Sequence, residues 1–396
     1  MLKELKSVLS LSFGHLVIDI YSPVIPAVLP LLIATHGWSY FLAGLLVAAF
    51  NITSSLLQPA VGYLSDRRGF SLPFAVPFLI ASLCIGAFGL IGNYPLLLIC
   101  AALAAFGSAT FHPLALSAVN RVSRKENRGR LTSIFVIGGN IGFALGPVLA
   151  GLAVSALGLP GILVLAVIGV VTALLSPLIF PREDMGREDT GHASRTGVCE
   201  APVSCRPIAL IVAVGALRSW VIYAAIAYLP TYFHVHLGAD LVTANALVSL
   251  MLVAGVAGQY VGGVLSDTYG RKEWTIFGLA ASVPFFVLFL VTSGPLSYAA
   301  LLIFGFFLWS TFSVTVAMAQ EVMPGNVGLA SGLMLGLAVG AGGIGVAVSG
   351  AIADASSLGT ALATFPLPIL AALILVFAVP YPWKALAGMR VWGGRG

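Results

Sequence analysis

The sequence has few charged residues and only one extended polar stretch. Asp, Glu, Lys and Arg make up 8% of the 396 residues, whereas 59% are hydrophobic. A typical soluble domain has about 25% charged residues. Because a soluble fold could not bury so much apolar surface, the composition excludes an ordinary soluble protein and predicts an integral membrane protein.

The hydrophobic runs lack the alternation of polar and apolar residues that membrane β-strands show over about 10 residues. They continue instead for the roughly 20 residues with which a helix crosses a hydrocarbon core of about 30 Å. We predict an all-α integral membrane protein with twelve transmembrane helices, near residues 8–33, 39–64, 71–92, 95–119, 131–157, 160–180, 207–235, 241–265, 274–293, 296–322, 327–354 and 361–381.

The patterns of a metal centre or an enzyme are also absent from the sequence. Of the four cysteines, Cys199 and Cys205 lie outside the predicted spans, and their spacing matches no common metal site. No paired carboxylates, nucleophile with a base, or phosphate-binding glycine loop followed by lysine occurs. We therefore predict no catalytic residue, no metal and no cofactor.

Basic residues are missing from every second predicted loop. All Lys and Arg residues except Arg218 precede the first span or follow an even-numbered span. Cytoplasmic loops of membrane proteins carry such an excess, so both termini are predicted to be cytoplasmic. Topology thus explains the net charge of +5, and no nucleic-acid partner is expected.

A polar stretch from Pro181 to Arg206 separates six predicted spans from six more. A motif in the first half recurs in the second, shifted by 201 residues: Gln58, Gly62, Leu64, Ser65, Asp66 and Gly69 match Gln259, Gly263, Leu265, Ser266, Asp267 and Gly270. We predict two pseudo-symmetric six-helix bundles. They comprise residues 1–180 and 207–396, joined by a cytoplasmic linker at 181–206, and the second ends in a short cytoplasmic tail.

The repeated motif is predicted to act as a conformational gate, with a charged loop anchor as the alternative. Its glycines allow close helix approach and a left-handed turn. Its carboxylates could cap a helix of the opposite half and so bias the inward/outward equilibrium. We expect Glu321 to pair with Arg271 or Lys272 in this gate. The predicted gate residues are Gly62, Asp66, Arg67, Gly69, Gly263, Asp267, Gly270, Arg271 and Glu321.

Small residues recur at a four-residue spacing in the fifth predicted span. They are Gly138, Gly142, Gly146 and, after Pro147, Gly151. Glycines at this spacing give a smooth face for tight helix packing, and Pro147 removes one backbone hydrogen bond and permits a bend. The motif predicts either a purely structural packing face or a feature of the transport cycle.

The repeated loop motif resembles the signature of major facilitators, and the glycines of the fifth span resemble the antiporter signature of drug exporters. Further stretches resemble the fosmidomycin-resistance branch, although Leu114 stands where members often carry an acidic residue. These stretches are Gly14-His15 with Asp19, Leu29-Pro30, 54–59, 111–113, 217–220, Gln320-Glu321 with Pro324-Gly325, 331–336 and 342–345. The resemblance implies the major facilitator fold and export of a small molecule such as a phosphonate antibiotic.

Two ionisable residues, Asp19 and Arg218, fall near the middle of predicted spans. A charge there costs about 2.5 to 3.5 kcal/mol on insertion scales, and usually marks a pathway or a pair. In the resembling fold the first and seventh helices line the central cavity. We therefore predict that both residues face it, pairing directly or exchanging partners with an anionic substrate and a proton; a static ion pair is the alternative.

Two histidines could join this site. His15 lies one helical turn before Asp19 and shares its face, and His112 lies at a comparable depth. Because histidine titrates near neutrality, the sequence predicts either a proton relay or histidines satisfied by ordinary hydrogen bonds. The aromatic residues Tyr21, Trp220, Tyr223 and Tyr228 could line the cavity or serve in packing.

These features predict a multi-pass transporter of the cell membrane that exports a small molecule by proton antiport. The proton is the expected coupling ion. The lipid bilayer and the substrate are the expected partners, and we expect a monomer. An organic-anion importer is the alternative within transport, and a receptor or scaffold without flux is the alternative outside it.

Overall fold

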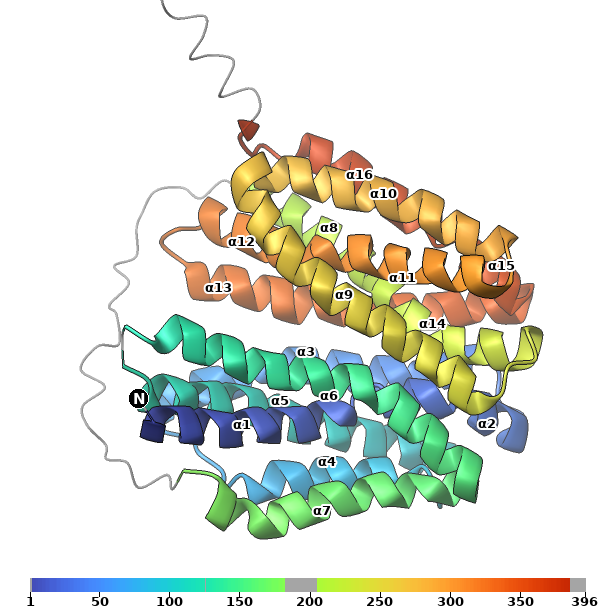
Figure 1. The fold of residues 1–396 in the computed structure, drawn as a ribbon, viewed down its shortest axis with the longest axis horizontal. Helices are drawn as coiled ribbons and strands as arrows, with labels where there is room; N and C mark the ends of the chain where they lie inside the picture. Colours follow the sequence, from blue (N-terminus) through green and yellow to red (C-terminus); the bar gives the residue numbers. More distant parts are fainter. Residues whose placement is uncertain (1, 125, 182–204, 385–396) are drawn as a thin grey trace, which may run out of the picture. The chain divides into compact units, whose positions relative to one another are not determined.

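The computed structural model describes residues 2–124, 126–181 and 205–384, and within these ranges the chain forms helices and no strands (Figure 1). The first six spans contain α1 (Leu2–Ile20), α2 (Val24–His36), α3 (Tyr40–Arg68), α4 (Ala75–Ala87), α5 (Tyr94–Val122), α6 (Arg128–Leu157), the 3₁₀ turn η1 (Leu159–Gly161) and α7 (Ile162–Ile179). The last six contain α8 (Cys205–Thr231), η2 (Tyr232–His236), α9 (Leu241–Tyr269), α10 (Arg271–Val291), α11 (Gly294–Ser310), α12 (Phe312–Val322), α13 (Val327–Gly332), η3 (Leu333–Ala338), α14 (Val339–Ala355), α15 (Leu358–Ala363) and α16 (Pro366–Ala378).

Eleven helical stretches of the described chain are long and apolar enough to cross a membrane, and α4 is a shorter apolar helix. Each of the twelve predicted spans corresponds to one of them, which confirms the predicted fold class. The third span is shorter than the predicted 71–92, because regular helix covers only Ala75–Ala87. Pro73 precedes this helix. After it, the N–H groups of Phe88 and Gly89 donate to carbonyls three residues earlier, which is the tighter 3₁₀ pattern and ends the α-helix.

The first span is a broken helix. Between α1 and α2 the chain turns at residues 21–23, where the N–H of Ser22 bonds to the carbonyl of Asp19. Pro23 and Pro26 have no N–H and cannot continue the hydrogen-bond ladder. The break thus falls immediately beside Asp19, and broken membrane helices often mark binding sites.

The second half repeats the helices of the first at a nearly constant offset. The span Tyr40–Ser65 of the first half has its counterpart in Leu241–Tyr269. In the same way, Tyr94–Val122 corresponds to Gly294–Val322, and Leu159–Ile179 corresponds to Leu358–Ala378. The glycines that close the repeated motif are Gly69, with φ +62°, and Gly270, with φ +107°. The predicted left-handed turn is confirmed at Gly69, whereas Gly270 combines its positive φ with a ψ of 139° and so takes a different conformation. Glycine is favoured at both positions because other residues rarely adopt positive φ.

The described residues form two compact units. The first contains the described residues up to 181 with Ile226–Ser249 and Val346–Ala355, and the second contains the remainder. The helices α8, α9 and α14 therefore contribute to both units. The predicted boundary between the halves stays a prediction, and the predicted linker at 181–206 lies almost wholly outside the described residues.

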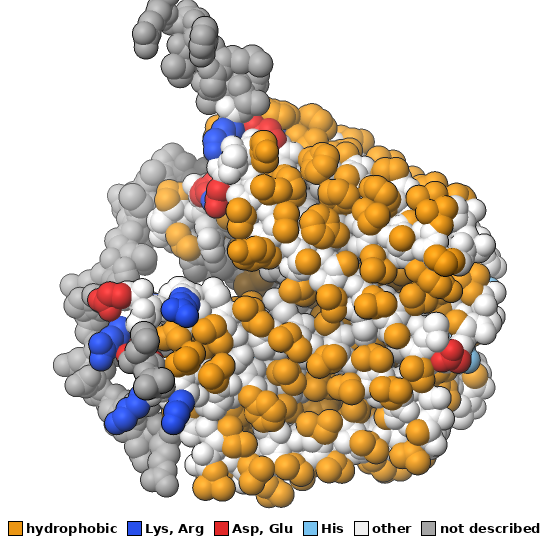
Figure 2. Space-filling view, in the orientation of Figure 1, with side chains coloured by type: hydrophobic (Ala, Val, Ile, Leu, Met, Phe, Trp, Pro, Cys, Tyr) orange, Lys and Arg blue, Asp and Glu red, His pale blue; other side chains and the backbone are white. Residues whose placement is uncertain are grey.

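Within the first unit α1 packs on α6, α3 on α5 and α4 on α7, and within the second unit α10 packs on α11 and α16. The outward faces of the long helices are hydrophobic, and in the first unit Lys and Arg side chains gather at the end where α1 begins (Figure 2). Leu178 is 83% exposed and Tyr260 76% exposed. Large apolar side chains exposed along whole helices suit contact with lipid rather than water.

Candidate transport site

Three titratable side chains meet at the middle of the first span. The two oxygens of Asp19 lie 3.1 Å from His15 Nε2 and 3.1 Å from His112 Nε2. His15 and Asp19 share one face of α1, and α5 supplies His112 beside its own Pro113. We call these three residues the His–Asp–His cluster. The structure thus brings together three of the predicted substrate and proton residues.

Two backbone carbonyls orient the histidines of the cluster. His15 Nδ1 lies 2.8 Å from the carbonyl of Phe135, and His112 Nδ1 lies 2.7 Å from that of Ser108. A carbonyl only accepts, so both Nδ1 atoms carry hydrogen. Each Nε2 then faces a carboxylate oxygen, and the contact is favourable only with a second hydrogen between them. With a hydrogen on each Nε2 as well, both rings donate to Asp19 and the cluster carries one net positive charge.

The described helices that pack on α1 bring no further charge close to the cluster. The helices packed on α1 are α5, α6 and α7. Of these, α7 carries no titratable residue, those of α6 lie at its start, and those of α5 other than His112 lie nine or more residues from it. The Phe135 ring stacks on His15 at 4.2 Å between centroids. The side chains of His15, Asp19 and His112 are 8%, 14% and 23% exposed, so all three are mostly buried.

One glycine that the sequence reasoning missed makes room for the cluster. A Cβ atom on Gly139 would lie 2.3 Å from His15 Nε2 and 2.7 Å from Asp19 Oδ2. Its signal in the sequence is weak, because it stands next to Gly138 and outside the four-residue spacing. A side chain at this position would therefore displace His15 and Asp19 from the arrangement seen here.

The antiporter-type glycines hold α6 directly against the backbone of α1. Cβ atoms on Gly138, Gly142 and Gly146 would lie 2.2, 2.0 and 2.5 Å from the carbonyl oxygens of three residues one turn apart, Ser12, Leu16 and Ile20. Further along, Gly151 faces Asn245, and the N–H that follows Pro147 donates to Ser249. The motif thus sets the position of the helix that carries His15 and Asp19, so its packing and transport interpretations are compatible.

Arg218 lies in the middle of α8 and is fully buried. Its Nη1 donates to Thr315 Oγ1 at 2.7 Å and to the carbonyl of Thr311 at 3.1 Å, and its guanidinium carbon lies 4.8 Å from the Phe312 ring centre. Its Nε and Nη2 have no hydrogen-bond partner among the described residues. Asp19 is held by the histidines of its own unit, so a direct pair with Arg218 stays a prediction.

The predicted aromatic residues have different environments. Tyr21 is 1% exposed and donates its hydroxyl hydrogen to the carbonyl of Leu165, which favours the packing interpretation for this residue. Trp220 and Tyr223 are half-buried and lie against Gly345 and Gly342 of the eleventh span. They are thereby fixed within about one and a half turns of Arg218 along α8.

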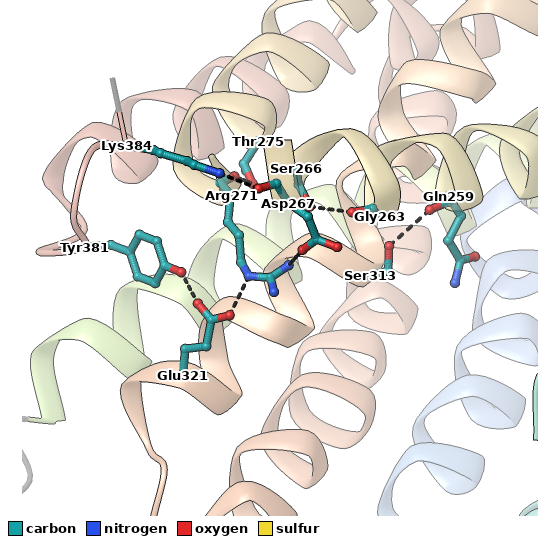
Figure 3. A network of polar contacts seen from close by, with 10 residues as sticks. All are labelled: Gln259, Gly263, Ser266, Asp267, Arg271, Thr275, Ser313, Glu321, Tyr381 and Lys384. Carbon is teal, nitrogen blue, oxygen red and sulfur yellow. Dashed lines mark hydrogen bonds and ion pairs between the residues drawn. The ribbon is translucent and has the colours of Figure 1, made fainter. Parts of the chain in front are cut away.

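The second copy of the repeated motif forms a polar network (Figure 3). Arg271 lies 2.5 Å from Glu321 and 3.1 Å from Asp267, so it is the partner that Glu321 takes. Tyr381 donates to the other oxygen of Glu321, and Lys384 donates to the carbonyl of Asp267. Burial and the Glu321 carboxylate raise the pKa of Tyr381, so its hydroxyl remains a donor.

The rest of the motif is described only in part. Lys272, the other predicted partner of Glu321, instead donates to the carbonyls of Phe377 and Val379 at the end of α16. In the first copy, Gly62 faces Pro113 as Gly263 faces Ser313 in the second. The side chains of Asp66 and Arg67 lie outside what the structure describes.

A group of contacts in the first unit was not predicted. Asp354 accepts hydrogen bonds from the N–H groups of Tyr40 and Phe41 at the start of α3, each at 2.8 Å. The Tyr228 hydroxyl lies within donating distance of the carbonyls of Tyr40 and Val346, at 2.9 and 3.1 Å. We call Tyr40, Tyr228 and Asp354 the latch. It lies at the helix ends opposite to the basic loops.

Comparison with known proteins gives the family. Residues 11–344 match the family model of the Major Facilitator Superfamily. The chain belongs to this superfamily. It is therefore a multi-pass membrane transporter by family, as the sequence motifs predicted.

Two bacterial relatives cover most of this major facilitator. The chain is 32% identical to the fosmidomycin resistance protein of Escherichia coli strain K12, over 88% of this chain and 86% of that protein. It is 30% identical to YfnC, an uncharacterized MFS-type transporter of Bacillus subtilis strain 168, over 96% of this chain and 92% of that protein.

Solved structures of low sequence identity share the fold. An inward-facing, occupied bacterial homologue of the lysosomal transporter Spinster has a TM-score of 0.80 at 16% identity, covering 94% of this chain and 96% of that one. A point mutant of the nucleoside transporter NupG has a TM-score of 0.79 at 14% identity, covering 95% of this chain and 100% of that one. These similarities confirm the major facilitator fold.

Proposed function

We propose that this major facilitator exports a small molecule from the cell by proton antiport. The observation that carries the proposal is the His–Asp–His cluster, in which two histidines contact one carboxylate at mid-span. The glycine face of α6 and the similarity to a fosmidomycin resistance protein support export. A phosphonate antibiotic such as fosmidomycin is the first substrate to test.

The cluster converts proton binding into a change of local structure. With both protons present, two imidazolium rings are drawn to one carboxylate. Without them, two nitrogen lone pairs face carboxylate oxygens and the contacts become repulsive, so α1 and α5 are no longer held together at this point. Because the two proton states favour different helix arrangements, proton binding shifts the conformational equilibrium of alternating access.

In this mechanism the proton is the coupling ion, and no other cofactor, metal or enzymatic step takes part. The protein acts as a monomer in the plasma membrane with both termini in the cytoplasm. The Asp267–Arg271–Glu321 network closes or opens with the cytoplasmic side. Protons enter the cluster from outside and leave to the cytoplasm, while the substrate moves the opposite way.

The test is uptake of labelled fosmidomycin into inside-out vesicles with an acid interior. Asp19→Asn removes the carboxylate charge, so we expect it to lower gradient-driven accumulation by about tenfold or more. The matched control is Asp240→Asn, since Asp240 is a carboxylate outside the cluster that caps α9 through Thr243, and Asn caps as well. Accumulation in Asp19→Asn equal to that in Asp240→Asn would contradict coupling at the cluster. Accumulation only under a reversed gradient would favour an organic-anion importer.

A further inference from the structure

The buried guanidinium of Arg218 is held on one edge and free on the other. Its Nη1 donates to Thr315 Oγ1 and to the Thr311 carbonyl, whereas Nε and Nη2 have no partner in the part of the chain that the structure describes. In a guanidinium group, Nε–H and the adjacent Nη2–H point the same way along one edge. This edge is the fork that binds two oxygens of a carboxylate or phosphonate at once.

The orientation of that free edge is fixed by its neighbours. The Thr315 hydroxyl lies 3.0 Å from the carbonyls of Thr311 and Phe312, so its hydrogen is directed to the helix and its lone pair faces Arg218. The Phe312 ring lies against the guanidinium at 4.8 Å. Contacts from the turn between α11 and α12 and from the first turn of α12 therefore hold both the position and the plane of the group.

No acidic side chain in the described part of the second unit neutralises Arg218. The acidic residues there are Asp267, Glu273 and Glu321. Asp267 and Glu321 bind Arg271 at the motif end of the unit, and Glu273 lies beside Gly270 at the same end. A fully buried cation with two unpaired donors is costly unless an anion joins it.

We propose that the Nε–Nη2 edge of Arg218 binds a two-oxygen oxyanion of the transported molecule, a carboxylate or a phosphonate. The proposal rests on the transport function proposed above and specifies its substrate class. A neutral or cationic compound would leave both donors unpaired and is therefore excluded as a preferred substrate. Lysine could supply the charge but not the paired donors, so the site requires arginine in particular.

The experiment measures binding without a gradient, by isothermal titration of the full-length protein in nanodiscs. The probes are fosmidomycin and its neutral diethyl phosphonate ester, which differ in the oxyanion. Wild type is expected to bind the acid about tenfold or more tightly than the ester. Arg218→Gln is expected to bind acid and ester equally. In Arg218→Lys, the logarithm of the acid-to-ester affinity ratio is expected to be less than half of the wild-type value. Arg206→Gln is the matched control, since Arg206 is exposed at the start of α8.

Binding of the ester by Arg218→Gln at the wild-type affinity shows that the variant is folded, so a lost preference for the acid supports the site. A preference that persists in Arg218→Gln, or equal binding of acid and ester by wild type, overturns it. Full recovery in Arg218→Lys overturns the two-donor geometry. Since no gradient is applied, a failure of proton coupling leaves these results unchanged, whereas a failure of this proposal leaves the Asp19→Asn flux experiment unchanged.

Discussion

At the scale of single residues, the cluster depends on hydrogen-bond direction. Without the carbonyls of Phe135 and Ser108, it would be undetermined which ring nitrogen of each histidine carries a hydrogen. Because these acceptors fix a hydrogen on each Nδ1, the protons between His15, Asp19 and His112 can be counted. Two predictions follow from the geometry of the cluster. One concerns proton release on substrate binding, and the other concerns a larger side chain at Gly139.

Substrate binding to the protonated protein is expected to release up to two protons in weakly buffered solution with a chelator present, as antiport requires. Asp19→Asn should release none, and His112→Gln about half as many as wild type, because one of the two Nε2–oxygen contacts is lost. The measurement is the pH change on adding fosmidomycin. His236→Gln is the control, since that histidine is exposed in η2. Full release from His112→Gln would show that the count is wrong.

Gly139→Ala is expected to lower gradient-driven transport by about tenfold, because its Cβ would overlap His15 Nε2 and separate it from Asp19. The control is Gly129→Ala in the same helix, where a Cβ atom meets nothing within 4 Å. That variant should keep wild-type transport and gain slight helix stability. Vesicle uptake and thermal unfolding of both variants check this, and normal transport by Gly139→Ala would rule out a crowded cluster.

At the scale of helices, two kinds of contact hold the described helices together. One is close backbone packing, and the other is capping of a helix end. The glycine face of α6 leaves α1 no freedom to rotate, since three of its carbonyls lie against glycines. The latch involves a helix end. There Asp354 accepts hydrogen bonds from two N–H groups of α3 that have no carbonyl partner within their own helix. The capping carboxylate comes from a helix remote in sequence, so these two hydrogen bonds exist only while the ends of α3 and α14 stay together.

Asp354→Ala is expected to destabilise the latched state by about 1 kcal/mol, the usual value of a lost cap, and so to raise the unlatched fraction about fivefold. The measurement is the rate at which a thiol reagent labels a cysteine introduced as Ala27→Cys. Ala27 is buried, and its carbonyl accepts a hydrogen bond from Asn245. Asp240→Ala removes a cap of α9 outside the latch and is the control. Equal labelling rates in the two variants would mean that Asp354 does not hold this end closed.

At the scale of the whole molecule, charge distribution sets the orientation in the membrane. We expect reporter fusions to place the loop after Gly270 in the cytoplasm and the loop at Asp240 outside, because Arg271 and Lys272 flank the first and no Lys or Arg flanks the second. Alkaline phosphatase fused at Asp240 should be active and at Gly270 inactive. The reverse pattern would invert the direction assigned to proton and substrate flow.

Much of this molecule could be predicted from local sequence. The number of spans follows from runs of about 20 apolar residues, and the repeat follows from residues shifted by 201 positions. The turns at Gly69 and Gly270 follow from the conformational freedom of glycine. The i to i+4 pairing of His15 with Asp19 follows from helix geometry. Each of these depends on residues near one another in the chain or on a pattern that the chain repeats.

Only the tertiary structure could decide which residues meet across helices. His112 joining Asp19, Thr315 holding Arg218, Tyr381 binding Glu321 and Asp354 capping α3 all link distant segments. Membrane helices are apolar on most of their circumference, so hydrophobic periodicity does not fix their rotation as it does in a soluble protein. Rotation is set by close backbone contacts such as those of the α6 glycines, and these arise only when the helices pack.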